Sequence, residues 1–141
     1  MVNDITNGIS VKLNSIYGDE YKIYDSNIRQ ELEQPCFFIK LIKVMNTPFL
    51  GKRKKREYIF NVHYFPVNDA DTDNINAVGD MLMEGLEYIT LANGDILRGK
   101  DMSYEVIDGV LHYNATYQVV LINTEKEDSM NQYGLDVGVR G

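Results

Sequence analysis

Residues 36–45 read Cys-Phe-Phe-Ile-Lys-Leu-Ile-Lys-Val-Met, and residues 57–67 read Glu-Tyr-Ile-Phe-Asn-Val-His-Tyr-Phe-Pro-Val. Both segments are rich in aromatic and branched side chains, which suit the pleated surface of a sheet. The Pro-Phe-Leu-Gly sequence at 48–51 interrupts the pattern between them. We therefore predict a hairpin of two long strands, 36–45 and 57–66. The period of two in the second strand predicts one core-facing row: Tyr58, Phe60, Val62 and Tyr64.

The connection between these strands is strongly basic. It carries five of the 14 basic residues of the chain, namely Lys52, Arg53, Lys54, Lys55 and Arg56. The rest of the 141-residue chain contains nine basic and 21 acidic residues, which gives it a formal charge of −12. Such an acidic body argues against broad, non-specific binding of nucleic acid. Three interpretations of the predicted basic loop stay open: a contact with another subunit, a solvated hairpin tip, or a contact with DNA or a lumen.

Two amphipathic helices are predicted to cover the sheet. In residues 4–17, apolar side chains recur at helical spacing, with Asn3 as the expected N-cap and Gly18 as the end. These apolar side chains are Ile5, Ile9, Leu13 and Ile16. A second helix follows the acidic loop and is expected to extend to Ile89. Its apolar stripe consists of Ile75, Val78, Leu82, Leu86 and Ile89. A short edge strand at 21–24 and a helical turn at 28–34 complete the first half of the chain.

The pair Asp108-Gly109 predicts a two-residue turn between the last two strands. That turn would pair Ile107 with Val110 and Glu105 with His112, and further along Met102 with Ala115. The expected fold is α+β: an antiparallel sheet of four to five strands, two amphipathic helices on one face, and a long basic hairpin loop. We expect one domain over residues 1–122 and a polar C-terminal tail over 123–141.

The acidic loop before the second helix resembles the opening of a calcium site. Three aspartates alternate there, but Asn74 and Asp80 stand where such a loop needs glycine and glutamate. This pattern favours a charged helix start made by Asp69, Asp71 and Asp73.

The two histidines, His63 and His112, fall on strands, where two imidazoles and a nearby acid can form a metal or acid–base site. The chain lacks a His-Glu-x-x-His spacing, and Glu105 is expected to be the cross-strand neighbour of His112. Cys36, the single cysteine, lies in an apolar run typical of a buried thiol. We therefore expect no catalytic residue, no bound metal and no cofactor. We also expect no signal peptide and no membrane span, and hence a cytosolic protein.

Five stretches of the sequence resemble one family. They are residues 37–41, 50–53, 56–66, 97–102 and 108–112, which together sample most of the chain. The order of these features resembles the tail terminator proteins of phages and prophages, in the group found with PBSX-like contractile tails of Gram-positive bacteria. None of the matching motifs is catalytic.

The resemblance implies a structural virion protein, or a component of a phage-tail-like bacteriocin. Such terminators form a ring, usually a hexamer, that caps the head-proximal end of the tail tube, stops its polymerisation and offers a joining surface. The implied partners are other copies, the tube, the sheath and the head–tail connector, with DNA as passing cargo. Assembly would take place in the host cytoplasm. Independently of the resemblance, the charge distribution makes Lys52–Arg56 the candidate interface with a subunit, the tube or the lumen. The alternative from the residues alone is a small nucleic-acid-binding module that uses residues 52–56.

Overall fold

The computed structural model describes residues 1–25 and 32–122. Two α-helices, a 3-10 turn and six strands follow one another along this part of the chain. Their bounds are α1 Val2–Tyr17, η1 Gly18–Glu20, β1 Lys22–Asp25, β2 Cys36–Pro48, β3 Arg53–Phe65, α2 Thr72–Gly85, β4 Tyr88–Thr90, β5 Ile96–Ile107 and β6 Val110–Ile122. The predicted tail, 123–141, and residues 28–31 of the predicted helical turn lie outside the described residues, and 32–34 form no helix.

The strands form one mixed sheet in the order β1-β2-β3-β6-β5-β4. The α+β class is confirmed, but the prediction of a purely antiparallel sheet with four to five strands is wrong. β1 pairs with β2 in parallel, and β4 adds a further short strand beside β5. Strand direction could not be predicted at β1, because the ten residues between Asp25 and Cys36 are too many for a two-residue hairpin turn that would set it. A four-residue strand also carries too little pattern to reveal its partner.

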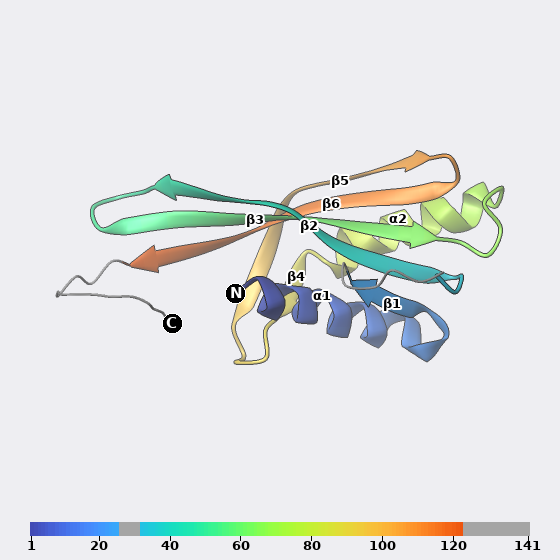
Figure 1. The fold of residues 1–141 in the computed structure, drawn as a ribbon, viewed down its shortest axis with the longest axis horizontal. Helices are drawn as coiled ribbons and strands as arrows, with labels where there is room; N and C mark the ends of the chain where they lie inside the picture. The colour runs from blue at the N-terminus through green and yellow to red at the C-terminus, as the bar shows by residue number, and fades with distance from the viewer. Residues whose placement is uncertain (26–31, 123–141) are drawn as a thin grey trace.

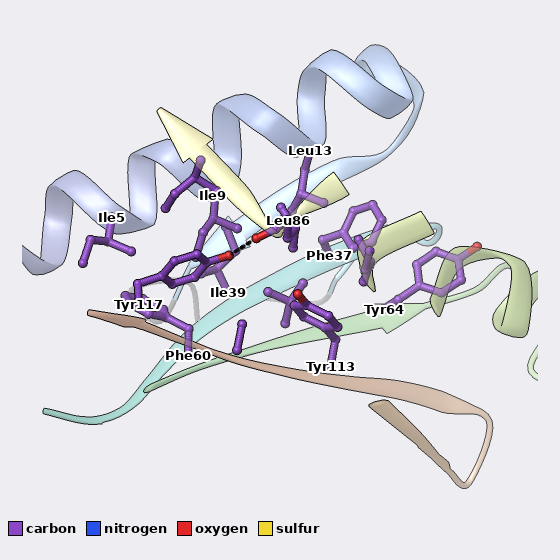
Figure 2. Packing of buried hydrophobic residues seen from close by; sticks show 14 of the residues in the cluster. Ile5, Ile9, Leu13, Phe37, Ile39, Phe60, Tyr64, Leu86, Tyr113 and Tyr117 are labelled. Atoms are coloured by element: carbon purple, nitrogen blue, oxygen red, sulfur yellow. Dashed lines mark hydrogen bonds between the residues drawn. The ribbon is translucent and has the colours of Figure 1, made fainter. Parts of the chain in front are cut away.

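Both helices pack on the same face of the sheet, which we call the core face; the opposite face is the outer face (Figure 1). The predicted stripes are confirmed in part: α1 buries Ile5, Ile9 and Leu13, and α2 buries Ile75, Val78 and Leu82. They meet the predicted row of β3 in the cluster drawn in Figure 2. That row is at most 4% exposed: Tyr58, Phe60, Val62 and Tyr64.

The end of α2 differs from the prediction. The helix stops at Gly85 rather than continuing to Ile89, which is buried in β4 instead. The backbone N–H of Leu86 still donates to the carbonyl of Leu82, but its own carbonyl accepts a hydrogen bond from Tyr117 of β6. A three-residue strand with one buried side chain is compatible with the helical period of 3.6 as well as with the strand period of two. The spacing of apolar residues therefore could not show where α2 ends and β4 begins.

The β5–β6 hairpin follows the predicted register near its turn. Ile107 pairs with Val110 and Glu105 with His112, and both turn residues have positive φ. The predicted pairing of Met102 with Ala115 is wrong, because the register shifts between Lys100 and Ser103. Asp101, at φ 53°, lies at this irregularity, as is common for the extra residue of a bulge.

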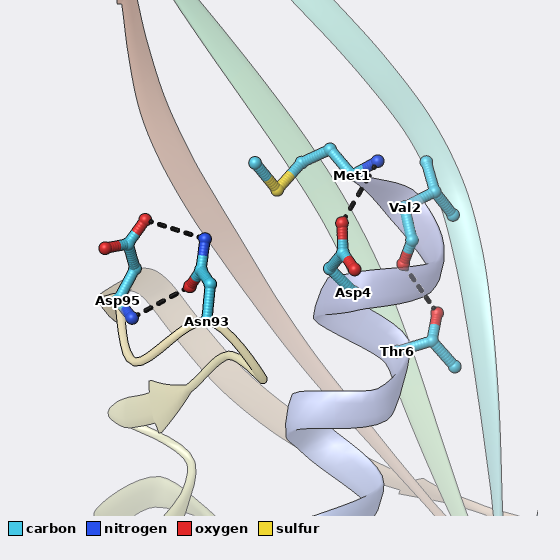
Figure 3. Close-up of polar contacts among 6 residues, drawn as sticks. All are labelled: Met1, Val2, Asp4, Thr6, Asn93 and Asp95. Carbon is cyan, nitrogen blue, oxygen red and sulfur yellow. Dashed lines mark hydrogen bonds and ion pairs between the residues drawn. The ribbon is translucent and has the colours of Figure 1, made fainter. Parts of the chain in front are cut away.

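Local polar contacts fix the ends of two segments (Figure 3). Helix α1 begins one residue after Met1, so the expected cap at Asn3 is wrong. The terminal amino group lies 3.5 Å from the Asp4 carboxylate in the first turn, where a negative charge suits the helix dipole. In the turn that contains Asn93 and Gly94, the Asp95 N–H donates to Asn93 Oδ1 over 2.9 Å.

Two buried tyrosines of β6 offer a matched stability test. Tyr117 Oη donates to the Leu86 carbonyl over 2.6 Å, whereas Tyr113 Oη has no hydrogen-bond partner among the described residues. Tyr117→Phe should lower the free energy of unfolding by about 1–2 kcal/mol, because it orphans a buried carbonyl. Tyr113→Phe, which removes a hydroxyl without a partner, should be neutral or stabilising. Equal losses in denaturant titrations of the two variants would contradict this assignment.

Candidate assembly site: the basic arm

The hairpin formed by β2 and β3 extends beyond both helices at one end of the long axis (Figure 1). The end of β6 runs beside it, since Arg53 pairs with Ile122 and Lys55 with Val120. We call this projection, residues 42–56 and 118–122, the arm. Burial in β2 ends with the half-buried Leu41, and every later residue of that strand is exposed.

The structure places the five basic residues at the end of the arm. Only Lys52 belongs to the turn; Arg53, Lys54, Lys55 and Arg56 are the first four residues of β3. The interpretation of 52–56 as a loop is therefore wrong for four of its five residues. The two strands extend further toward the turn than predicted. The exposed start of β3 carries long basic side chains without alternating apolar residues, so the sequence contains no strand signal there.

Strand geometry divides these charges between two faces. Successive side chains of a strand point to opposite faces, and Tyr58 of β3 faces the core. Lys54 and Arg56 therefore share the core face with Tyr58, and Arg53 and Lys55 share the outer face. The hydrogen bond from Arg56 Nε to Oδ1 of Asn46, its cross-strand partner, spans 3.0 Å. A partner could thus meet positive charge on either face of the arm.

Apolar side chains are exposed among these charges. At the turn, Leu50 is 70% and Phe49 is 45% exposed, and Ile122 at the end of β6 is 65% exposed. Ile42, Val44 and Met45 of β2 and Val120 of β6 are exposed as well. Single exposed apolar residues are ordinary, but a concentration on one projection marks a candidate contact surface.

The arm is fixed at its tip and at its base. At the tip, the Phe49 N–H donates to the Arg53 carbonyl over 2.9 Å, and Lys55 Nζ lies 5.9 Å from the centre of the Phe49 ring. At the base, the carboxylate of the buried Glu57 pairs with Lys100 of β5. The arm therefore continues the sheet and is joined to the body through three strands.

The two histidines, which the sequence could only place on separate strands, are direct cross-strand partners. Their ring centroids lie 4.3 Å apart on the outer face, and His63 Nε2 contacts Asn61 Oδ1. Burial, the neighbouring His112 and Lys40 lower the pKa of His63 to about 4. No group of three or more His, Cys, Asp or Glu able to hold a metal occurs in the described part of the chain.

The lowered pKa of His63 predicts how stability depends on pH. The folded protein keeps this ring neutral down to about pH 4, whereas an unfolded histidine protonates near 6.5. The stabilisation is therefore complete above pH 6.5 and is lost as the pH falls toward 4. The ring is partly exposed, so we expect a loss on the order of 1–2 kcal/mol. His63→Gln should flatten this part of a stability–pH profile; an unchanged profile would contradict the assignment.

The other candidates have structural roles. The Asp71 side chain accepts a hydrogen bond from the Asn74 N–H over 3.2 Å and so caps α2, while Asp73 lies in the first turn of that helix. This is the charged helix start that the sequence favoured over a calcium loop. Cys36 is fully buried, and burial raises the pKa of its thiol to about 11.

The fold and its surface define a small α+β protein with an exposed basic arm. A family model described as phage tail terminator protein matches residues 4–129. The chain belongs to that family. No curated protein matches the chain significantly. Within the described residues, neither helix is long and apolar enough to cross a membrane.

Family membership confirms the resemblance drawn from the sequence. It assigns the protein a structural role in the phage tail, in contact with other tail proteins, as part of the virion or tail particle. Family membership by itself assigns no role to the arm.

Proposed function

We propose that the protein forms a ring, with six copies expected, that caps the head-proximal end of the tail tube. The ring stops tube polymerisation and presents the surface to which a head–tail connector, and in a contractile tail the sheath, is joined. In this proposal the arm of each copy reaches the next copy around the ring. One observation carries it: a basic projection on a chain whose remaining residues have a net charge of −12.

Charge and shape both support a head-to-tail contact. A basic arm and an acidic body are complementary between identical copies, and a heterologous contact closes into a ring when the rotation allows it. The exposed apolar residues of the arm, such as Leu50 and Phe49, would be buried in the same contact. Burial of this apolar surface would stabilise the contact, and the charges would set its orientation.

The test is to mix purified protein with tail tubes and to examine tube ends by electron microscopy, with mass photometry of the protein alone in parallel. We expect one ring at the head-proximal end of each tube and no tube growth past it. Tubes that keep growing in the presence of excess protein, with bare ends, would overturn the proposal. A monomer in the absence of tubes would not, since the tube can template the ring.

The alternative function is nucleic-acid binding through Lys52–Arg56. The specific observation in its favour is that the arm carries positive charge on both faces, and such charges can contact several phosphates. A salt titration of DNA binding separates the two, because several phosphate contacts produce a steep loss of affinity with salt. Steep, tight binding to DNA without tube binding would favour the alternative.

A further inference from the structure

The outer edge of β2 is paired over only part of its length. β1 covers Cys36–Ile39, and no described residue pairs with that edge between Lys40 and Pro48. The exposed side chains of this stretch include Ile42, Val44 and Met45. An edge of this kind is a template for an added strand.

The same edge discourages indiscriminate pairing. Lys40 and Lys43 lie along it, and the register of β2 shifts between Leu41 and Lys43. Lysines and bulges are common devices that keep edge strands from aggregating. A strand that adds here specifically should therefore bring negative charge toward Lys43 and the basic start of β3.

The C-terminal sequence offers a candidate strand with no net charge of its own, preceded in the chain by an acidic segment. Residues 133–140 read Tyr-Gly-Leu-Asp-Val-Gly-Val-Arg, in which every second residue is apolar. This strict alternation is typical of a half-buried strand. Residues 125–128, Glu-Lys-Glu-Asp, have three acidic side chains and one basic, hence a net charge of −2. The segment 133–140 lies beyond residues 4–129, so the family match does not account for it.

We propose that residues 133–140 of one copy add as a strand to the outer edge of β2 in the arm of the neighbouring copy. The inference rests on the ring proposed above. Ile122, the last described residue, lies beside Arg53 at the end of the arm. The ten residues 123–132 can span up to about 35 Å, enough to reach an adjacent subunit. In a closed ring every copy donates one strand and accepts one, so that each β2 edge is filled.

Crosslinking tests the donation directly in the full chain. Val44→Cys on β2 and Val137→Cys in the donated segment are combined, and the protein is assembled on tail tubes and treated with a short bismaleimide. The buried Cys36 should not react, and the variants with only one of the two substitutions control for it. We expect a ladder of covalently linked chains on a denaturing gel.

Two further substitutions check that alternation matters. Leu135→Asp places a charge in the apolar row of the segment and should abolish the ladder. Gly134→Asp adds the same charge to the opposite face and should leave the ladder in place. Amides of residues 40–47 should also gain protection from hydrogen exchange on assembly, and lose it in the Leu135→Asp variant.

The possible failures are distinguishable. A ring on the tubes without crosslinks, or with links only within one chain by mass spectrometry, would overturn the donation and leave the proposed function standing. Bare tube ends without any ring would overturn both.

Discussion

Replacing Lys52, Arg53, Lys54, Lys55 and Arg56 by glutamate should abolish capping of tail tubes while leaving the fold intact. Each substitution changes the charge by two units, so the net charge falls from −7 to −17. Exposed ion pairs contribute up to about 1 kcal/mol each, and reversal also adds repulsion, so we expect apparent affinity to fall about 100-fold or more. Thermal unfolding should change little, because these side chains are exposed or half-buried.

Double substitutions can identify the face of the arm that makes the contact. Lys54→Glu with Arg56→Glu reverses the core face, and Arg53→Glu with Lys55→Glu reverses the outer face. A matched control, Lys12→Glu with Lys22→Glu, moves the net charge equally but lies on α1 and β1.

A contact dominated by one face should lose capping in one arm double variant only. Added salt should weaken capping by the wild-type protein, since it screens attraction, and should weaken it less in a double variant that still caps tubes. Capping unaffected by any arm variant would remove the arm from the interface.

What the sequence could predict about the fold depended on whether a signal was local. Every second residue from Tyr58 to Tyr64 is apolar, and the prediction that this row faces the core is correct. The apolar stripes that begin at Ile5 in α1 and at Ile75 in α2 were equally local signals. The parallel pairing of β1 could not be predicted, because it depends on where the chain returns after residue 25. The bulge at Asp101 could not be predicted either. The sequence on both sides of it alternates as in a regular strand, although the pairing with β6 shifts there.

For the candidate site, the sequence predicted the concentration of positive charge but not how the strands divide it between two faces. The concentration of Lys52–Arg56 is plain in the sequence, but polar side chains at an exposed strand end give no period from which to assign faces. The proximity of His63 and His112 was missed for a different reason. It requires the long-range register of β3 against β6, whereas only the local register of the β5–β6 hairpin could be derived from its turn.

Gly109→Ala should cause the largest loss of stability among the single substitutions considered. Gly109 has φ 76°, and a Cβ there would lie 2.5 Å from the Asp69 Cβ and 2.9 Å from the Asp69 carbonyl oxygen. Alanine at positive φ costs about 1–2 kcal/mol, and forcing apart two packed segments adds about 1–3 kcal/mol, giving about 2–5 kcal/mol in all. Denaturant unfolding measures this loss, with an unchanged slope if the folded state is otherwise retained.

A matched glycine isolates the contact from the backbone term. Gly94 also has positive φ, 96°, but a Cβ there meets nothing within 4 Å, so Gly94→Ala should cost only the conformational part. Equal losses of stability at the two glycines would contradict this assignment, because they would show that the close contact between the added methyl group and Asp69 costs no free energy of unfolding.

Because this turn lies at the opposite end of the sheet from the arm, Gly109→Ala should lower stability yet retain capping at temperatures where it stays folded (Figure 1). The arm reversal should do the opposite, which would separate assembly from stability.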